Sequence, residues 1–169
     1  MGSEMCIRDR PDSAPCAIVQ DILEIWDCTN CTKNSDFTGA QIAAIKSDED
    51  AKHGTQDVTR LSDPTIKQDC HGATLGIPYR VDSIRSFFLI RGYQETSNPS
   101  EAVFCIHGSS ETHSSHSLTQ GNMTVVGCDG QPQQQPTTMV TGKFGVGSRL
   151  RMPLPKVQKA YPGTVIYVK

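Results

Sequence analysis

Apolar residues recur in a helical rhythm near the start of the chain. Between positions 17 and 26 they fall at i, i+3, i+4 and i+7, while polar and acidic residues occupy the other side. This spacing predicts a short amphipathic helix. Residues 27–40 are polar and turn-forming. Residues 44–70 carry mixed charges and few apolar positions, which indicates a surface excursion or a weak helix rather than core.

The chain becomes more apolar after Pro78. Residues 87–93 and 102–106 are short β-rich runs joined by a polar connection, which predicts a hairpin-like pair of strands. Residues 108–122 are rich in Ser, Thr and His and are expected to form a loop. Residues 129–138 (DGQPQQQPTT) are expected to be a Pro/Gln linker, because such a sequence has no means of packing a core.

The last segment predicts a helix followed by a strand. Leu150, Leu154 and Val157 have helical spacing, and the prolines among them favour a helix that begins near Pro155. Residues 164–168 are β-branched and nearly all apolar, as expected of a parallel strand buried on both faces. We therefore expect residues 101–107 and 164–168 to be parallel strands that end at the same sheet edge, with a right-handed crossover between them.

Length and composition limit the class of protein. A chain of 169 residues suits one domain, and its 14 glycines and 10 prolines indicate a loop-rich one. The net charge of −2 gives no basic field for nucleic acid, and the longest apolar runs are too short to span a bilayer. Residues 1–10 (MGSEMCIRDR) resemble translated sequencing adapter, so we treat them as a non-native leader and assign the domain to residues 11–169.

Cysteine usage favours an oxidising compartment. An even number of cysteines outside the leader suits a disulfide-bearing secreted domain, although the sequence does not choose the pairing. Acceptor sequons at Asn30 and Asn122 are compatible with the secretory route. We therefore predict a secreted protein. The disulfide candidates are Cys16, Cys28, Cys31, Cys70, Cys105 and Cys128.

Three stretches resemble a known family, in the right order along the chain. They are Cys16 followed by Trp26-Asp27-Cys28-Thr29-Asn30-Cys31, Arg91-Gly92-Tyr93 followed by EAVFCIHGSS at 101–110, and VQKAYPGTVIYV at 157–168. Together they resemble the N-terminal part of secreted class 3 (fungal-type) lipases, of the α/β-hydrolase superfamily, ending before that family's Gly-His-Ser-Leu-Gly-Gly elbow. His107 departs from the family, which usually has arginine there, and the Pro/Gln segment replaces its Val-His-x-Gly-Phe segment.

This resemblance implies a fold and an activity. The fold would be α/β: a partial, loop-rich α/β-hydrolase fold, with an incomplete and mostly parallel sheet flanked by helices. The parent protein would hydrolyse lipid esters by serine acyl transfer without a cofactor, and Ser109 would contribute to the oxyanion hole. At least one of Cys16, Cys28 and Cys31 would form a disulfide. No Gly-x-Ser-x-Gly elbow occurs in residues 1–169, so we expect this chain to be inactive as an esterase.

Two alternatives belong to other classes of function. Cys105, His107, His113 and His116 lie close in sequence, and zinc accepts thiolate and imidazole ligands. Their spacing matches no structural finger, so the favoured interpretation is a loop with surface histidines, and we expect no bound metal. The second alternative is a small, secreted, disulfide-rich binding module without catalysis.

Overall fold

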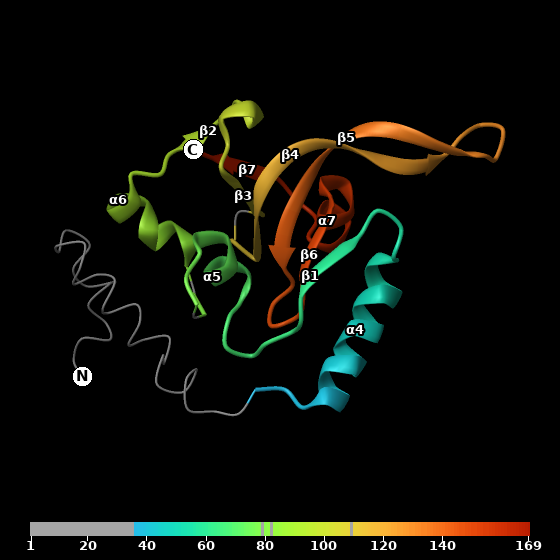
Figure 1. The fold of residues 1–169 in the computed structure, drawn as a ribbon. Helices are drawn as coiled ribbons and strands as arrows, with labels where there is room; N and C mark the ends of the chain where they lie inside the picture. The colour runs from blue at the N-terminus through green and yellow to red at the C-terminus, as the bar shows by residue number, and fades with distance from the viewer. Residues whose placement is uncertain (1–35, 79, 82, 109) are drawn as a thin grey trace.

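The computed structural model describes residues 36–169 except residues 79, 82 and 109 (Figure 1). The helix expected over residues 17–26 and three cysteines of the lipase-like segment, Cys16, Cys28 and Cys31, lie outside this part. The described chain forms a seven-stranded sheet in the order β1-β6-β5-β4-β3-β7-β2. Every neighbouring pair of strands in it is antiparallel.

The described elements are seven strands of very different length, four helices and two 3-10 turns. The strands are β1 (Thr59–Ser62), β2 (Glu95–Thr96), β3 (Phe104–His107), β4 (His113–Val126), β5 (Pro132–Lys143), β6 (Arg149–Pro153) and β7 (Val165–Val168). The helices are α4 (Gly39–His53), α5 (Cys70–Leu75), α6 (Phe88–Arg91) and α7 (Leu154–Ala160), with 3-10 turns η2 (Ile84–Phe87) and η3 (Pro99–Glu101). None of the described helices has the length and apolar character needed to cross a membrane.

Local sequence signals account for the ends of two helices. The backbone N–H of Gln41 donates to the Thr38 hydroxyl, and the Gln41 side chain accepts from the Thr38 N–H, so a capping box starts α4. In α7 a proline occupies the first turn, where its missing N–H costs no helical hydrogen bond. The expected helix near Pro155 is therefore present, and it begins one residue earlier than the sequence indicated.

The expected mostly parallel α/β sheet is wrong. β3 and β7 belong to one sheet, as expected, but they are antiparallel neighbours, with Phe104 opposite Val168 and Ile106 opposite Ile166. The C-terminal end of β3 therefore lies beside the start of β7, not beside its end. Apolar residues on both faces of β7 indicated a sheet covered on both sides, and such cover does not by itself fix strand direction.

Both faces of the sheet are indeed covered. On one side, here called the α5 face, inward residues of β3 and β7 pack against α5, η2 and the segment between them. On the other, the α7 face, inward residues of β3, β5 and β6 pack against α7. The buried core of the α5 face is Leu75, Val81, Ile84, Phe87, Phe104, Ile106 and Val168. That of the α7 face is Cys105, Val140, Leu150, Met152, Leu154 and Val157.

Three local expectations are also wrong, and the same sheet explains each. Residues 87–93, expected as a strand, are mostly helical, because Phe87 is a core residue of the cover over the α5 face. The expected loop at 108–122 and linker at 129–138 instead form most of the β4–β5 hairpin. Long-range pairing at the base of this hairpin supplies the backbone hydrogen bonds that the local composition did not indicate.

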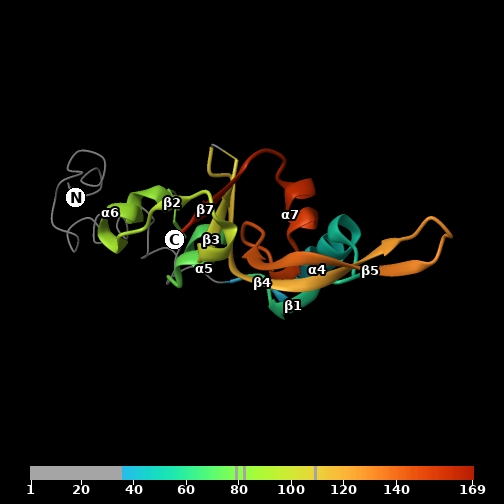
Figure 2. The same cartoon turned by 90° about the horizontal axis from the view of Figure 1, so that it is seen from above.

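The outer part of this hairpin, residues 119–138 and here called the arm, extends beyond the neighbouring strands (Figures 1 and 2). Its two edges are blocked in different ways. On β5, Pro132 and Pro136 lie two residues before and two residues after Gln134, which pairs with Thr124 on β4. Because the pairing pattern repeats every two residues, the backbone nitrogens of both prolines point outward, as that of Thr124 does. The Thr124 N–H points outward and donates to the Asp57 carboxylate at 2.6 Å. Proline and a capping carboxylate therefore both remove outward donors, which limits edge-to-edge pairing with other strands.

Candidate functional site

The four residues of the zinc alternative lie on two different faces of the sheet. Cys105 and His107 are two residues apart on β3, and His113 is directly opposite His107 on β4. All three therefore project to the α7 face. His116 is opposite Phe104, so it projects to the α5 face. The described residues contain no group of three or more His, Cys, Asp or Glu side chains that could hold a metal ion.

The buried thiol and imidazole of Cys105 and His107 do not form an activated nucleophile. The Cys105 Sγ lies 3.6 Å from His107 Nε2, which also lies 3.1 Å from the Ser115 hydroxyl. Burial raises the pKa of Cys105 to about 12 and lowers the pKa of His107 to about 4. Both groups are therefore neutral near pH 7, whereas a reactive cysteine needs a thiolate beside a cationic group.

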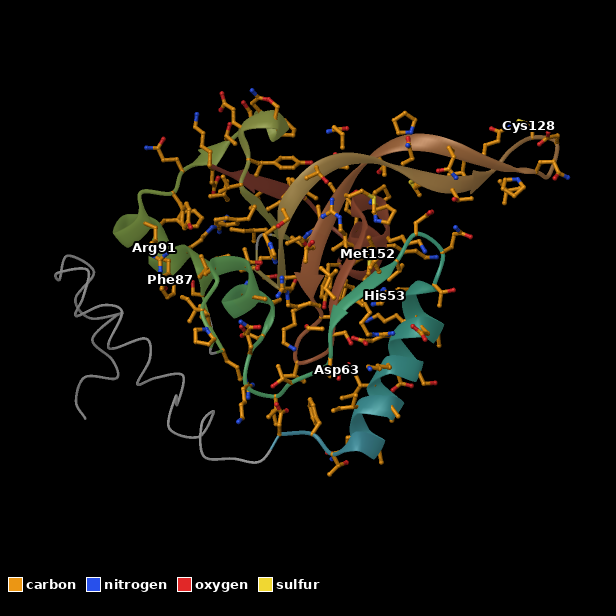
Figure 3. All side chains as sticks on the ribbon, in the orientation of Figure 1. His53, Asp63, Phe87, Arg91, Cys128 and Met152 are labelled. Carbon is orange, nitrogen blue, oxygen red and sulfur yellow. The ribbon has the colours of Figure 1, made fainter. Side chains whose placement is uncertain are left out.

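The described cysteines lie far apart in the fold. Cys70 is buried on α5, Cys105 is buried on the α7 face, and Cys128 is exposed at the tip of the arm (Figure 3). All three are free thiols in this structure. The disulfide expected among Cys16, Cys28 and Cys31 falls outside the described residues, as does Ser109, the expected oxyanion-hole residue.

The candidate site is a pocket on the α5 face. It has a volume of about 470 Å³ and lies where the C-terminal end of α5 approaches strands β4 and β6. Its wall combines small apolar side chains with two basic ones. The lining residues of this α5 pocket are Gln68, Ala73, Thr74, Leu75, Gly76, Pro78, His116 and Arg149.

Arg149 is the principal charged group of the pocket. It begins β6 opposite Lys143, and its side chain is half-buried. Its Nε is fully buried without a hydrogen-bond acceptor, and no carboxylate pairs with its guanidinium among the described residues. A guanidinium carries five N–H donors and stays charged at any accessible pH. Arg149 therefore brings to the pocket lining a positive charge that no described carboxylate pairs with.

His116 is the second basic group of the pocket, and a β-bulge holds it in place. The pairing of β4 with β5 shifts after His116, and Ser117 adopts a left-handed conformation with φ of 54°. The Arg151 guanidinium donates to the Ser117 carbonyl at 3.1 Å, which stabilises this uncommon backbone conformation. The Ser117 hydroxyl lies 2.8 Å from His116 Nδ1.

The other ring nitrogen of His116, Nε2, is buried without a partner among the described residues. Burial, followed by repulsion from Arg149 and Arg151, lowers the pKa of His116 below its ordinary value. His116 is therefore neutral at pH 7. The pocket lining thus combines one permanent cation with one neutral imidazole whose second nitrogen has no hydrogen-bond partner among the described residues.

Sequence reasoning named His116 only as a candidate ligand in the zinc alternative, which was not favoured, and it missed Arg149. The sequence around Ser117 gives no signal for the bulge, and no sequence motif relates β4 to the start of β6. The two side chains share a pocket because both strands pair with β5, so that His116, Thr141 and Arg149 project to the same face. Only the pairing register provides that information.

Comparison with known proteins adds no family: no protein-family model, no curated protein and no solved structure matches this chain.

Proposed function

We propose that this protein is a binding module that takes a small anionic ligand in the α5 pocket. The observation that carries the proposal is the Arg149 guanidinium, which has a buried Nε and no described carboxylate partner. A buried donor left unpaired costs about 1–3 kcal/mol, and more when the group is charged. An anionic ligand would satisfy this donor and the charge together.

The remaining geometry favours binding over chemistry. Ala73, Leu75 and Pro78 give the pocket an apolar wall, and a few polar groups on such a wall are typical of small-molecule sites. The Cys105 and His107 pair lies on the opposite face of the sheet, so it does not reach a ligand in this pocket. A binding module was also the second alternative indicated by the sequence.

The α/β-hydrolase fold implied by the resemblance is not the fold of the described residues. In open α/β sheets the active site lies beyond the carboxyl ends of the strands. Here the end of β3 lies beside Val165, at the start of β7, so residues after His107 and residues after Val168 leave opposite ends of the sheet.

The proposal is tested by titrating the purified protein with small anions in a calorimeter. Arg149→Met should weaken binding of any anion at least about tenfold, because a charge-assisted hydrogen bond is lost. Arg91→Met removes the same charge from an exposed position on α6, outside the pocket (Figure 3), and should leave affinity unchanged. Equal weakening by both variants would indicate a general charge effect and would contradict a specific site.

A further inference from the structure

His116 gives the pocket a second anchor of a different kind from Arg149. Its Nδ1 is already engaged with the Ser117 hydroxyl at 2.8 Å, while its Nε2 is buried, unpaired among the described residues, and part of the pocket lining. If the Ser117 hydroxyl donates to Nδ1, the imidazole proton resides on Nε2 and becomes a donor to the ligand. An acceptor with two oxygens could then contact both His116 and Arg149.

We propose that the ligand of the α5 pocket is a monocarboxylate with an apolar body, whose carboxylate is bound by Arg149 and by Nε2 of His116. This inference rests on the proposed function and specifies its ligand. A carboxylate is planar and accepts from a guanidinium and an N–H donor at once. The apolar body would lie against Ala73, Leu75 and Pro78.

The charge around the pocket favours a single negative charge over a polyanion. The pocket lining also contains Ala73, Thr74 and Leu75, the last residues of α5, and Gly76, its C-cap. Carbonyl groups at the C-terminal end of a helix carry partial negative charge. They offset part of the Arg149 field, so a phosphate with two charges is bound less well than a carboxylate.

Binding of a carboxylate should also take up a proton. A negative group next to His116 raises the pKa of the imidazole, which burial, Arg149 and Arg151 hold low in the free protein. The other titratable groups nearby are on β5 and α5. Lys143 on β5 is buried opposite Arg149, and burial lowers its pKa to about 8. On α5, Cys70 is buried and both ring nitrogens of His71 are engaged, with Ser114 and Glu111. Because the bound state has the higher pKa, affinity rises as pH falls through the interval between the two values.

The test is calorimetric titration of the full chain with hexanoate, hexanamide and inorganic phosphate, at about pH 8 and about pH 5.5. We expect hexanoate to bind, hexanamide to bind at least about tenfold more weakly, and phosphate to bind less well than hexanoate. Hexanoate affinity should increase severalfold at the lower pH. His116→Gln keeps an N–H donor but does not titrate, so it should bind hexanoate with little pH dependence.

The outcomes separate this inference from the proposed function. Tighter binding of phosphate than of hexanoate, with loss of both in Arg149→Met, leaves an anion site and overturns the carboxylate assignment. The same pH dependence in His116→Gln as in the original protein overturns the role of His116. Absence of binding for every anion, or equal binding of hexanoate and hexanamide, overturns the proposed function itself.

Discussion

Several buried polar side chains have nitrogen atoms without a hydrogen-bond partner among the described residues. The His113 ring stacks on Tyr161 with centroids 4.2 Å apart and an angle of 1° between the planes. Both nitrogens of that ring are buried and unpaired among the described residues. His107 lies directly opposite on β3, with ring centroids 5.2 Å apart. These two imidazoles are tolerated only in their neutral forms, because a charged ring there would lack both water and a counter-charge.

Acid should therefore destabilise the fold. Burial holds the pKa of His107 at about 4 and that of His113 well below 6.5, so the unfolded chain takes up protons first as pH falls. Each of these histidines should reduce the free energy of unfolding by about 1.4 kcal/mol per pH unit below about pH 6.5. Urea denaturation between about pH 7 and about pH 5 measures this slope. His113→Phe keeps an aromatic ring on Tyr161 and should reduce the slope by less than half, because burial also lowers the pKa of His53 and His116. An unchanged slope would mean that His113 is not buried in the neutral form.

Gly142 is required where β5 passes this stacked ring. A Cβ added there would lie 2.9 Å from His113 Nε2 and 3.2 Å from the Ser115 hydroxyl oxygen. Gly142→Ala should therefore lower the free energy of unfolding by about 1–3 kcal/mol, as expected for overpacking. Gly121→Ala on the arm is the comparison, because its Cβ would meet the flexible, half-exposed Met139 side chain. Chemical denaturation of both variants should show the larger loss for Gly142→Ala, and the reverse order would contradict this packing.

At the scale of elements, the arm is the least supported part of the sheet. A two-stranded ribbon is marginal in water, and the described chain braces this one mainly at Thr124, through Asp57 and Gln56. The backbone nitrogens of Pro132 and Pro136 lie on the free edge of β5, and proline has no N–H to donate there. The prolines therefore stop β5 from pairing along its free edge with a second chain.

Replacing both prolines should promote self-association. Pro132→Thr with Pro136→Thr restores two outward N–H groups on the free edge of β5 and adds residues with higher strand propensity. We expect the weight-average mass in sedimentation equilibrium to rise with concentration more steeply than for the original protein. Gln134→Thr, between the two prolines, adds threonine but no new donor and should behave like the original protein. Association in this control alone would show that side chains, not edge donors, cause it.

At the scale of the whole molecule, one helix joins two distant parts of the antiparallel sheet. The chain forms β3, β4, β5 and β6 in succession as neighbours, and α7 then carries it back to β7 on the other side of β3. The covering segments around α5 and α7 give each face its own core. The α5 pocket lies beside the core of the α5 face, where the C-terminal end of α5 approaches His116 and Arg149.

This architecture and the sequence together predict no esterase activity. The chain has no Gly-x-Ser-x-Gly elbow, and β3 and β7 leave opposite ends of the sheet. Purified protein should therefore hydrolyse p-nitrophenyl butyrate no faster than a buffer blank. A serine-reactive phosphonate distinguishes a contaminant from an intrinsic site. Hydrolysis that remains with the protein through purification and is abolished stoichiometrically by the phosphonate would overturn this prediction.

The sequence by itself determined the elements whose local pattern and final burial agree. Residues 101–107 and 164–168 were expected as core strands of one sheet, and the structure contains β3 and β7 there. The helix near Pro155 was also indicated correctly, because proline at a helix start and Pro162-Gly163 after its end act locally. These signals depend only on residues close in sequence.

The tertiary structure decided strand direction, the β4–β5 hairpin and the pocket. Apolar residues on both faces of β7 are equally compatible with parallel and antiparallel neighbours, so burial alone did not give its direction. Within the polar segments at 108–122 and 129–138, residues 113–122 and 132–138 belong to strands because long-range pairing satisfies their backbone hydrogen bonds, and that pairing outweighs local propensity. Arg149 and His116 meet only through the register of β4, β5 and β6, since alternation along paired strands sets which side chains share a face.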